Sequence, residues 1–305
     1  MTILVAGATG LAGSAIVREL TRIGRPVIGI SSRDVDLLDR NATFKFLTKL
    51  KPSVVIDAAA KVGGINANNS YPVEFLSNNI QIQTNLMDAS HAVNVERFIF
   101  LGSNCIYPKN CLQPIKEEYI LTGVLEPTNS AYAIAKLAGI ELIKSYRKEH
   151  AHKWISVMPI NLYGPNDNFD LESSHVFPAL IRKFTDAVRN NSKTVTVWGT
   201  GKPRREFLHV DDLSKAIILC LDKYDSEEHI NIGTGADLTI SELANKIAEI
   251  SGFNGEIVWD SSQSDGTPRK VLDIQKITNL GWKPTITLEQ GIKSTVEWYL
   301  ENKNK

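Results

Sequence analysis

Short apolar runs alternate with longer amphipathic stretches through the first half of the chain. The runs are apolar at almost every position, which is typical of strands in a parallel sheet whose two faces are both covered by helices. They comprise residues 3–6, 27–30, 54–56, 98–101 and 156–159. Between them, helical periodicity predicts helices over 12–21, 40–50, 72–93 and 132–150. This alternation predicts an α/β fold with a doubly wound parallel sheet, the Rossmann architecture.

The pattern becomes less regular after about residue 165. Polar, turn-rich loops separate the predicted elements in this part. One strand is predicted over 195–198, and four helices are predicted over 176–189, 210–221, 241–252 and 288–302. Residues 161–165 are interpreted as a turn that leaves the preceding strand. We expect a cofactor-binding domain over residues 1–165, with a returning segment at about 207–232. We expect residues 166–206 and 233–305 to form a smaller substrate-binding lobe.

The composition argues against several classes of protein. Lysine plus arginine and aspartate plus glutamate are equal at 34 each, whereas a nucleic-acid-binding protein normally shows a basic excess. No apolar run approaches the roughly 20 residues of a membrane span, and no basic segment precedes the first run, so no signal peptide is expected. The three cysteines fit neither a disulfide scaffold nor a metal site. We expect a soluble, cytoplasmic protein that binds a small molecule, with no nucleic acid, membrane or metal as a partner.

Three glycines lie between the first predicted strand and the first predicted helix, with the spacing G-x-x-G-x-x-G. Glycines there let the backbone approach a pyrophosphate, whose charge is stabilised by the amides and the dipole of the helix N-terminus. The position after a strand and before a helix is the context that this motif requires. It predicts a dinucleotide site formed by Gly7, Ala8, Thr9, Gly10, Leu11, Ala12 and Gly13.

The end of the second predicted strand bears on the choice between NAD and NADP. An NAD enzyme usually places an acidic residue on the ribose 2′-OH roughly 20 residues after the glycine motif. Here the chain has Ser31, Ser32 and Arg33, whose hydroxyl and guanidinium groups suit a 2′-phosphate. We therefore expect NADP(H), with Arg33 on the phosphate. Because Asp34 follows directly, an ordinary surface position for Arg33 is the alternative.

A tyrosine and a lysine share one face of a predicted helix. Tyr132 and Lys136 have the spacing Y-x-x-x-K, and Ser103 ends a predicted strand about 30 residues earlier. A nearby cation favours phenolate, so we expect Lys136 to lower the pKa of Tyr132 toward a value useful for proton transfer. Candidates for the N-cap of this helix are Thr128, Asn129 and Ser130.

These features together resemble the extended short-chain dehydrogenase/reductase family, whose members act on nucleotide sugars. Five segments resemble, more narrowly, the branch that epimerises and reduces GDP-4-keto-6-deoxy sugars with NADPH. They are AKVGGI at 60–65, GSNCIYP at 102–108, LEPTN at 125–129, NLYGP at 161–165 and REFLHVDD at 205–212. Two positions depart from the pattern, since Asn104 stands where many relatives have a small hydroxyl residue and Thr9 where some have an arginine.

The resemblance implies a role for each catalytic residue. Tyr132 would donate a proton to the C4 oxygen, Lys136 would orient the nicotinamide ribose and polarise Tyr132, and Ser103 would hydrogen-bond the C4 oxygen. A 4-keto group acidifies the C–H bonds at C3 and C5, so one acid/base pair can serve both centres. The resemblance assigns that pair to Cys105, two residues beyond Ser103, and to His175 from the other lobe.

The same resemblance implies further ligand contacts and a homodimer. NADP(H) would also contact Leu101, Gly102, Asn104, Lys136, Pro159, Asn161, Leu162 and His175. The GDP-sugar would contact Lys183, Trp198, Arg205, Asp265 and Lys270. Trp198 offers a flat surface for a base or ribose, and Arg205 a charged fork for phosphate. The helices over 72–93 and 132–150 are candidate dimer contacts, although their apolar faces could belong to the core alone.

The residues after the strand end bear on three other functions. A 4,6-dehydratase needs a carboxylate pair after the strand-end hydroxyl residue, where this chain has Asn104 and Cys105. An epimerase/reductase that inverts only C5 of a 3-deoxy sugar stays open. A non-catalytic NADP-binding regulator has no need of the full set of serine, tyrosine and lysine. His209 is expected to form a structural hydrogen bond, and neither Cys111 nor Cys220 is assigned a role.

Overall fold

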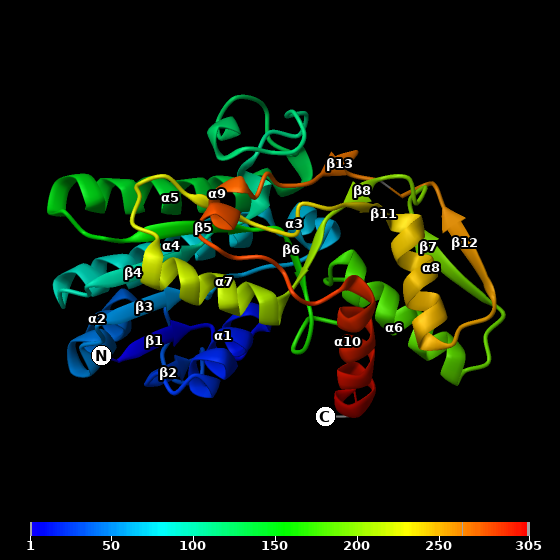
Figure 1. Ribbon diagram of the computed structural model, residues 1–305, viewed down its shortest axis with the longest axis horizontal. Helices are drawn as coiled ribbons and strands as arrows, with labels where there is room; N and C mark the ends of the chain where they lie inside the picture. The colour runs from blue at the N-terminus through cyan, green and yellow to red at the C-terminus, as the bar shows by residue number, and fades with distance from the viewer. Residues whose placement is uncertain (1, 264, 304–305) are drawn as a thin grey trace.

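A parallel sheet of six strands lies at the centre of the N-terminal part of the chain (Figure 1). In the computed structural model, which describes residues 2–263 and 265–303, its strand order is β10-β5-β4-β3-β1-β2. The strands are Ile3–Ala6 (β1), Val27–Ile30 (β2), Val54–Asp57 (β3), Arg97–Leu101 (β4), Ile155–Pro159 (β5) and Ile230–Ile232 (β10). All neighbouring strands run parallel, which confirms the doubly wound fold expected from the sequence.

The apolar strand sequences reflect burial on both faces of the sheet. Every residue of β1, β3 and β5 is buried, including Asp57, the one charged residue of these three strands. The edge strand β2 is different, since Ile28 and Gly29 are exposed. The expectation of burial on both faces is therefore wrong for this strand, which lies at one edge of the sheet.

Helices cover both faces of this sheet. The helices α1 and α7 pack together on one face, and α2, α4 and α5 pack together on the other (Figure 1). Their bounds are Leu11–Arg22 (α1), Arg40–Leu50 (α2), Pro72–Ala92 (α4), Ser130–His150 (α5) and Val210–Lys223 (α7). The periodicity located all five because each buries one apolar face. None of the helices that the structure describes is both long and apolar enough to cross a membrane.

A second lobe with its own apolar core lies beside the sheet, on the right in Figure 1. It contains the helices Val176–Arg189 (α6), Ile240–Ser251 (α8) and Leu288–Asn302 (α10), and the parallel strand pair Thr194–Trp198 (β7) and Glu256–Asp260 (β12). A small sheet joins Leu238–Thr239 (β11), Arg204–Arg205 (β8) and Arg269–Lys270 (β13), and Asn161–Tyr163 (β6) pairs with Phe207–His209 (β9). The short helices are Ile65–Ser70 (α3), Gln275–Asn279 (α9), Asn104–Ile106 (η1), Glu117–Tyr119 (η2) and Pro127–Asn129 (η3).

The elements that the sequence pattern missed are mostly short. The strand β10 adds a sixth strand to the main sheet, and β6 forms where only a turn was expected. Both are three residues long, too short to show a periodic signal. Each depends on a partner far away along the chain, β5 for β10 and β9 for β6.

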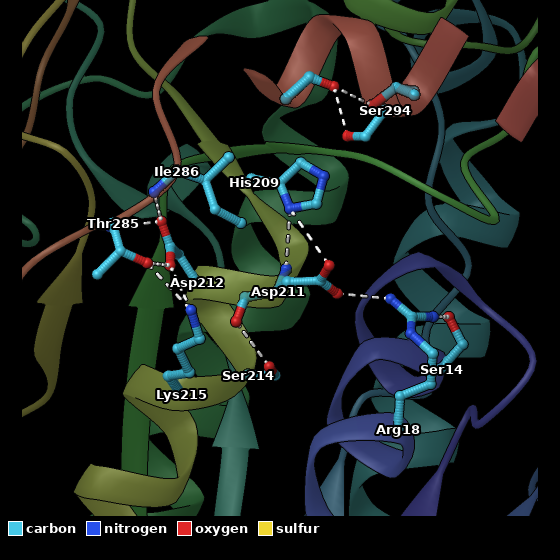
Figure 2. A network of polar contacts seen from close by, with 12 residues as sticks. Ser14, Arg18, His209, Asp211, Asp212, Ser214, Lys215, Thr285, Ile286 and Ser294 are labelled. Carbon is cyan, nitrogen blue, oxygen red and sulfur yellow. Dashed lines mark hydrogen bonds and ion pairs between the residues drawn. The ribbon is translucent and has the colours of Figure 1, made fainter. Parts of the chain in front are cut away.

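An acidic pair in the first turn of α7 joins three parts of the chain (Figure 2). Asp212 is buried and accepts hydrogen bonds from the backbone amides of residues 285–286, in the segment that leads to α10. Asp211 forms an ion pair with Arg18 on α1 at 2.6 Å. His209 caps α7, because its Nδ1 accepts a hydrogen bond from the amide of Asp211. The structural hydrogen bond expected for this histidine is therefore present.

Candidate active site

The glycine loop between β1 and α1 is shaped by close backbone contacts. Gly7 has a φ of +78°, and a Cβ atom at Gly13 would lie 2.2 Å from the carbonyl oxygen of Gly7. A side chain at either position is therefore excluded. Gly10, the N-cap of α1, forms no side-chain cap, so the first amides of a twelve-residue helix remain available to an anion. This loop fits the pyrophosphate of a dinucleotide.

The loop after β2 presents an exposed arginine. Arg33 is exposed and forms no ion pair with any residue that the structure describes. The neighbouring Asp34 carboxylate is turned back onto Ser31, accepting from its amide at 2.8 Å and from its hydroxyl at 2.9 Å. These hydrogen bonds lower the pKa of Asp34. Since the acid is engaged locally, Arg33 is left as the group that could meet a phosphate.

Tyr132 and Lys136 lie one turn apart on α5. Lys136 is buried, and its Nζ donates a hydrogen bond to the carbonyl of Leu101 at 2.8 Å and lies 5.9 Å from the centre of the Tyr132 ring. Burial lowers the pKa of Lys136 to about 8, and the charge of Asp57 opposes this effect. Tyr132 and Lys136 are thus brought together as the sequence predicted.

The expected lowering of the pKa of Tyr132 is not what the structure shows. Burial raises the pKa of Tyr132 well above its usual value, and the nearby Cys105 thiol adds to the rise, while the Ser103 hydroxyl opposes it. The desolvation of the buried phenol is the largest effect, and the charge of Asp57 raises the pKa as well. Tyr132 therefore carries its proton at neutral pH and is suited to donate it.

Cys105 and Ser103 lie on the turn that follows β4. The Ser103 hydroxyl accepts a hydrogen bond from the amide of Cys105 at 3.3 Å and so caps the short helix η1. The Cys105 sulfur accepts a hydrogen bond from the Asn129 amide at 3.3 Å. The sequence suggested Asn129 only as a helix cap, yet its side chain makes no cap contact with α5. The contact of Asn129 with the Cys105 sulfur could not be predicted from its position before α5 in the sequence.

His175 comes from the other lobe, at the N-cap of α6. The loop before it is held by Gly64, whose amide donates to the carbonyl of Ser173 at 2.8 Å. The surrounding protein lowers the pKa of His175, while the residue stays accessible to solvent. Within the described part of the chain, no hydrogen bond or ring contact joins His175 to Cys105. Their predicted pairing on a sugar stays a prediction.

Three residues predicted to bind the nucleotide sugar lie on elements of the second lobe. The Nζ atom of Lys183 lies 5.3 Å from the centre of the Trp198 ring and donates to the carbonyl of Thr196. Trp198 keeps 50% of its surface exposed, which leaves room to stack on a base. Burial lowers the pKa of Arg205, and the charges of Asp265, Glu126 and Cys105 oppose this effect. Arg205 therefore reaches toward the turn that carries Cys105.

The two other predicted sugar contacts are engaged within the protein. Asp265 accepts hydrogen bonds from the amide and the hydroxyl of Thr200, both at 2.7 Å. Lys270 is buried, and its Nζ donates to the side-chain oxygen of Asn104 at 3.4 Å. Asp265 thus connects two loops of the second lobe, and Lys270 connects this lobe to the turn after β4. Their contact with a substrate stays a prediction.

The remaining predicted cofactor contacts lie where β4 and β5 end. Leu101 ends β4 and Gly102 follows it, whereas Pro159 ends β5. The other three are Asn104 in η1 and Asn161 and Leu162 in β6. Carboxyl ends of parallel strands share one edge of a sheet, so the residues at the ends of β4 and β5 lie at the same edge as the glycine loop. No group of three or more metal-binding side chains is present among the described residues.

Comparison with known proteins places these features in a family. The model of the NAD dependent epimerase/dehydratase family matches residues 3–233. The putative GDP-L-fucose synthase 2 of Arabidopsis thaliana is 52% identical over 301 residues, which are 98% of this chain and 92% of that protein. GDP-L-fucose synthase of Escherichia coli (strain K12) is 47% identical over 313 residues, covering 99% of this chain and 98% of that protein.

A solved structure agrees over the whole length. A GDP-L-fucose synthetase from Naegleria fowleri bound to NADP has a TM-score of 0.92 and 32% identity, covering 100% of this chain and 95% of that chain. These similarities confirm the resemblance to extended short-chain dehydrogenases/reductases drawn from the motifs. The chain belongs to the NAD dependent epimerase/dehydratase family.

Proposed function

We propose that this protein is a bifunctional NADPH-dependent enzyme that epimerises GDP-4-keto-6-deoxy-D-mannose at C3 and C5 and then reduces C4, forming GDP-L-fucose. The observation that carries this proposal is a thiol beside a reductase site. The Cys105 sulfur is held by Asn129 on the same turn as Ser103 and acts electrostatically on Tyr132. A simple reductase has no use for that thiol. The relatives named as GDP-L-fucose synthases, at 47% and 52% identity, support the same conclusion.

The residues of the first lobe fit NADP(H). The glycine loop leaves the space that a pyrophosphate needs, and Arg33 is free to meet a 2′-phosphate. The Naegleria structure supports this choice, since that protein binds NADP. Bound NADPH supplies the hydride that reduces C4.

In the reduction, the chain has to hold the ketone and deliver one proton. Tyr132, whose raised pKa keeps the phenol protonated, donates that proton to the C4 oxygen. Ser103 hydrogen-bonds the same oxygen as negative charge develops on it. Lys136 orients the ribose and stabilises the phenolate that Tyr132 leaves behind.

In the epimerisation, one group removes a proton and another returns it on the opposite face. We assign these tasks to Cys105 and His175, acting on the C–H bonds that the 4-keto group acidifies at C3 and C5. A thiolate is a competent base for such a carbon acid. The lowered pKa of His175 makes its protonated form a stronger acid, which helps the return of the proton.

The second lobe is proposed to bind the GDP part of the substrate. Trp198 would stack on the base or ribose, and Arg205 and Lys183 would meet the phosphates. We propose that residues 1–165 and 207–232 form the cofactor side, and residues 166–206 and 233–305 the substrate side. The two apolar cores follow this division in part, since Leu272, Ile277 and Trp282 pack in the first core and Tyr163 and Phe207 in the second.

We also propose a homodimer that forms through α4 and α5. These two helices pack side by side on one face of the sheet (Figure 1). They leave Val73 and Ile134 exposed at 76% and 47%. Light scattering on the purified chain tests this proposal, and a mass of 33.8 kDa in solution would contradict it.

Turnover of purified protein with a panel of nucleotide 4-keto sugars tests the function. We expect NADPH oxidation with GDP-4-keto-6-deoxy-D-mannose, and NMR of the product should show the L-configured sugar. NADPH oxidation with release of the D-configured 6-deoxy sugar would leave only the reductase function. Inversion at C5 alone, with a preference for a 3-deoxy substrate, would identify the C5-only enzyme instead.

A further inference from the structure

One buried acid near the reductase residues has no role in the mechanism above. Asp57 is the last residue of β3, and none of its surface is accessible. Its Oδ1 accepts a hydrogen bond from the amide of Ala59 at 3.1 Å. Its Oδ2 is buried and has no hydrogen-bond partner. A carboxylate in the middle of a sheet is costly unless an opposite charge lies close by.

The sheet register shows which face Asp57 occupies. Asp57 on β3 lies opposite Phe100 on β4 in the parallel pair. Side chains of directly opposed residues point to the same face of a sheet. The Phe100 ring lies on the α5 face, since a Cβ atom at Gly139 would come within 2.4 Å of it. Asp57 therefore points to the face that carries α5.

On that same face, Phe100 carries a buried ammonium group. The Nζ atom of Lys136 lies 4.7 Å from the centre of the Phe100 ring. An ammonium has three donors, and the structure gives this one a single acceptor, the carbonyl of Leu101. The charge of Asp57 acts on Lys136, and that of Lys136 on Asp57, without a direct hydrogen bond between them.

Two further titratable side chains lie near this pair. They are Tyr132 on α5 and Cys105 after β4, and the charge of Asp57 raises the pKa of Tyr132 as well. β1 is entirely apolar, and the buried polar residues of α4, which are Asn79, Gln83, Asn85 and Ser90, do not titrate. Among the described residues, Asp57 is thus the one acid whose charge raises the pKa of Lys136.

We propose that Asp57 is a positioning residue of the reductase site: its buried carboxylate is the counter-ion that keeps the Lys136 ammonium charged and in place beneath Tyr132. This inference rests on the proposed function, because it concerns the step in which Tyr132 donates a proton. Asp57 does not touch the substrate. It acts through Lys136, which must be charged to stabilise the phenolate that the step leaves behind.

The two titrations define the pH range in which the pair is ionic. Burial raises the pKa of Asp57 to about 6 and lowers the pKa of Lys136 to about 8. Both groups are therefore charged between these values. Without the carboxylate, burial acts on Lys136 unopposed, and its pKa falls further. Reduction should then fail at a lower pH than in the wild type.

The experiment is single-turnover hydride transfer from NADPH to GDP-4-keto-6-deoxy-D-mannose as a function of pH. Asp57→Asn and Asp57→Leu both remove the charge, and Asp57→Glu keeps it. We expect the alkaline limb of the rate profile to move down by about one pH unit in both neutral variants, in line with the usual effect of one nearby charge. We expect the glutamate variant to keep the wild-type limb. NADPH binding is measured at about pH 6.5, where Lys136 should be charged in every variant, and we expect it to be retained.

Two neutral variants are used in case one of them does not fold. Asp57→Leu leaves no unpaired polar group in the core, so it measures the effect of the lost charge even if Asp57→Asn does not fold. Identical alkaline limbs in the wild type and the folded neutral variant would overturn the proposal. A wild-type enzyme that transfers no hydride to any GDP-4-keto sugar would instead refute the proposed function, so the two failures are distinguishable.

Discussion

Single residues decide which cofactor is used. Arg33 is exposed and forms no ion pair with a described residue, while the Asp34 carboxylate accepts hydrogen bonds from Ser31, so the loop after β2 presents a positive charge. Arg33→Ala should raise the KM for NADPH by about tenfold, the worth of one charge-assisted contact, and leave the KM for NADH unchanged. Steady-state kinetics with both cofactors measure this. As a control, Arg22→Ala removes an exposed arginine of α1 that is paired with Glu19, and an equal rise there would contradict the assignment.

Tyr132 separates the two half-reactions. Tyr132→Phe removes the proton donor and should slow C4 reduction by roughly 10²–10⁴-fold. Exchange of solvent deuterium into the keto sugar should continue, because Cys105 and His175 remain. Rapid-quench assays of reduction and NMR of the exchanged sugar give the two rates. If exchange is lost together with reduction in a folded variant, Tyr132 also takes part in epimerisation.

At the scale of elements, the segment at 62–66, which leads into α3, positions the segment that carries His175. A Cβ atom at Gly64 would lie 2.3 Å from the carbonyl oxygen of Ser174. Gly64→Ala should therefore displace this segment and reduce deuterium exchange at C3 and C5, with NADPH binding retained. Gly24→Ala is the control, since nothing lies within 4 Å of a Cβ atom there and only its φ of +73° is strained. Equal exchange rates in both variants would show that Gly64 does not position His175.

The helices and strands were predictable to different degrees. Long helices such as α2 and α6 agree with the sequence prediction, because each buries one apolar face and solvates the other. The strands β6 and β10 were not predictable, since three residues carry no period and their pairing comes from distant segments. Ser103, Tyr132 and Lys136 followed from motif spacing and strand ends. Asn129 and Asp57 did not, because their roles depend on neighbours from other elements.

At the scale of the whole molecule, one buried carboxylate joins segments that leave two different sheets. Glu206 lies between β8 and β9, and none of its surface is accessible. It accepts hydrogen bonds from the amides of Gly235 and Leu272, each at 2.7 Å, and from the amide of Thr234. These three donors follow β10 and β13, which belong to different sheets. The carboxylate thus fixes the end of the main sheet to the small sheet that contains β8 and β13.

Glu206→Gln should lower the free energy of unfolding by about 3 kcal/mol, because an amide nitrogen would face backbone N–H groups that need an acceptor. Urea denaturation followed by circular dichroism measures the loss. Glu289→Gln, on the exposed side of α10, is the matched control and should leave the stability nearly unchanged. Equal stability of the two variants would contradict the role of Glu206 in holding the two sheets together.

The central claim is that one chain both inverts and reduces the sugar, and Cys105 is its most direct test. The measurement is NMR of the product formed by Cys105→Ser in deuterated water with NADPH. We expect deuterium uptake at C3 and C5 to be abolished or strongly slowed, NADPH binding to be intact, and any reduced product to be the D-configured 6-deoxy sugar. Normal amounts of the L-configured sugar at the wild-type rate would contradict the account, because the thiol would then have no part in the inversion.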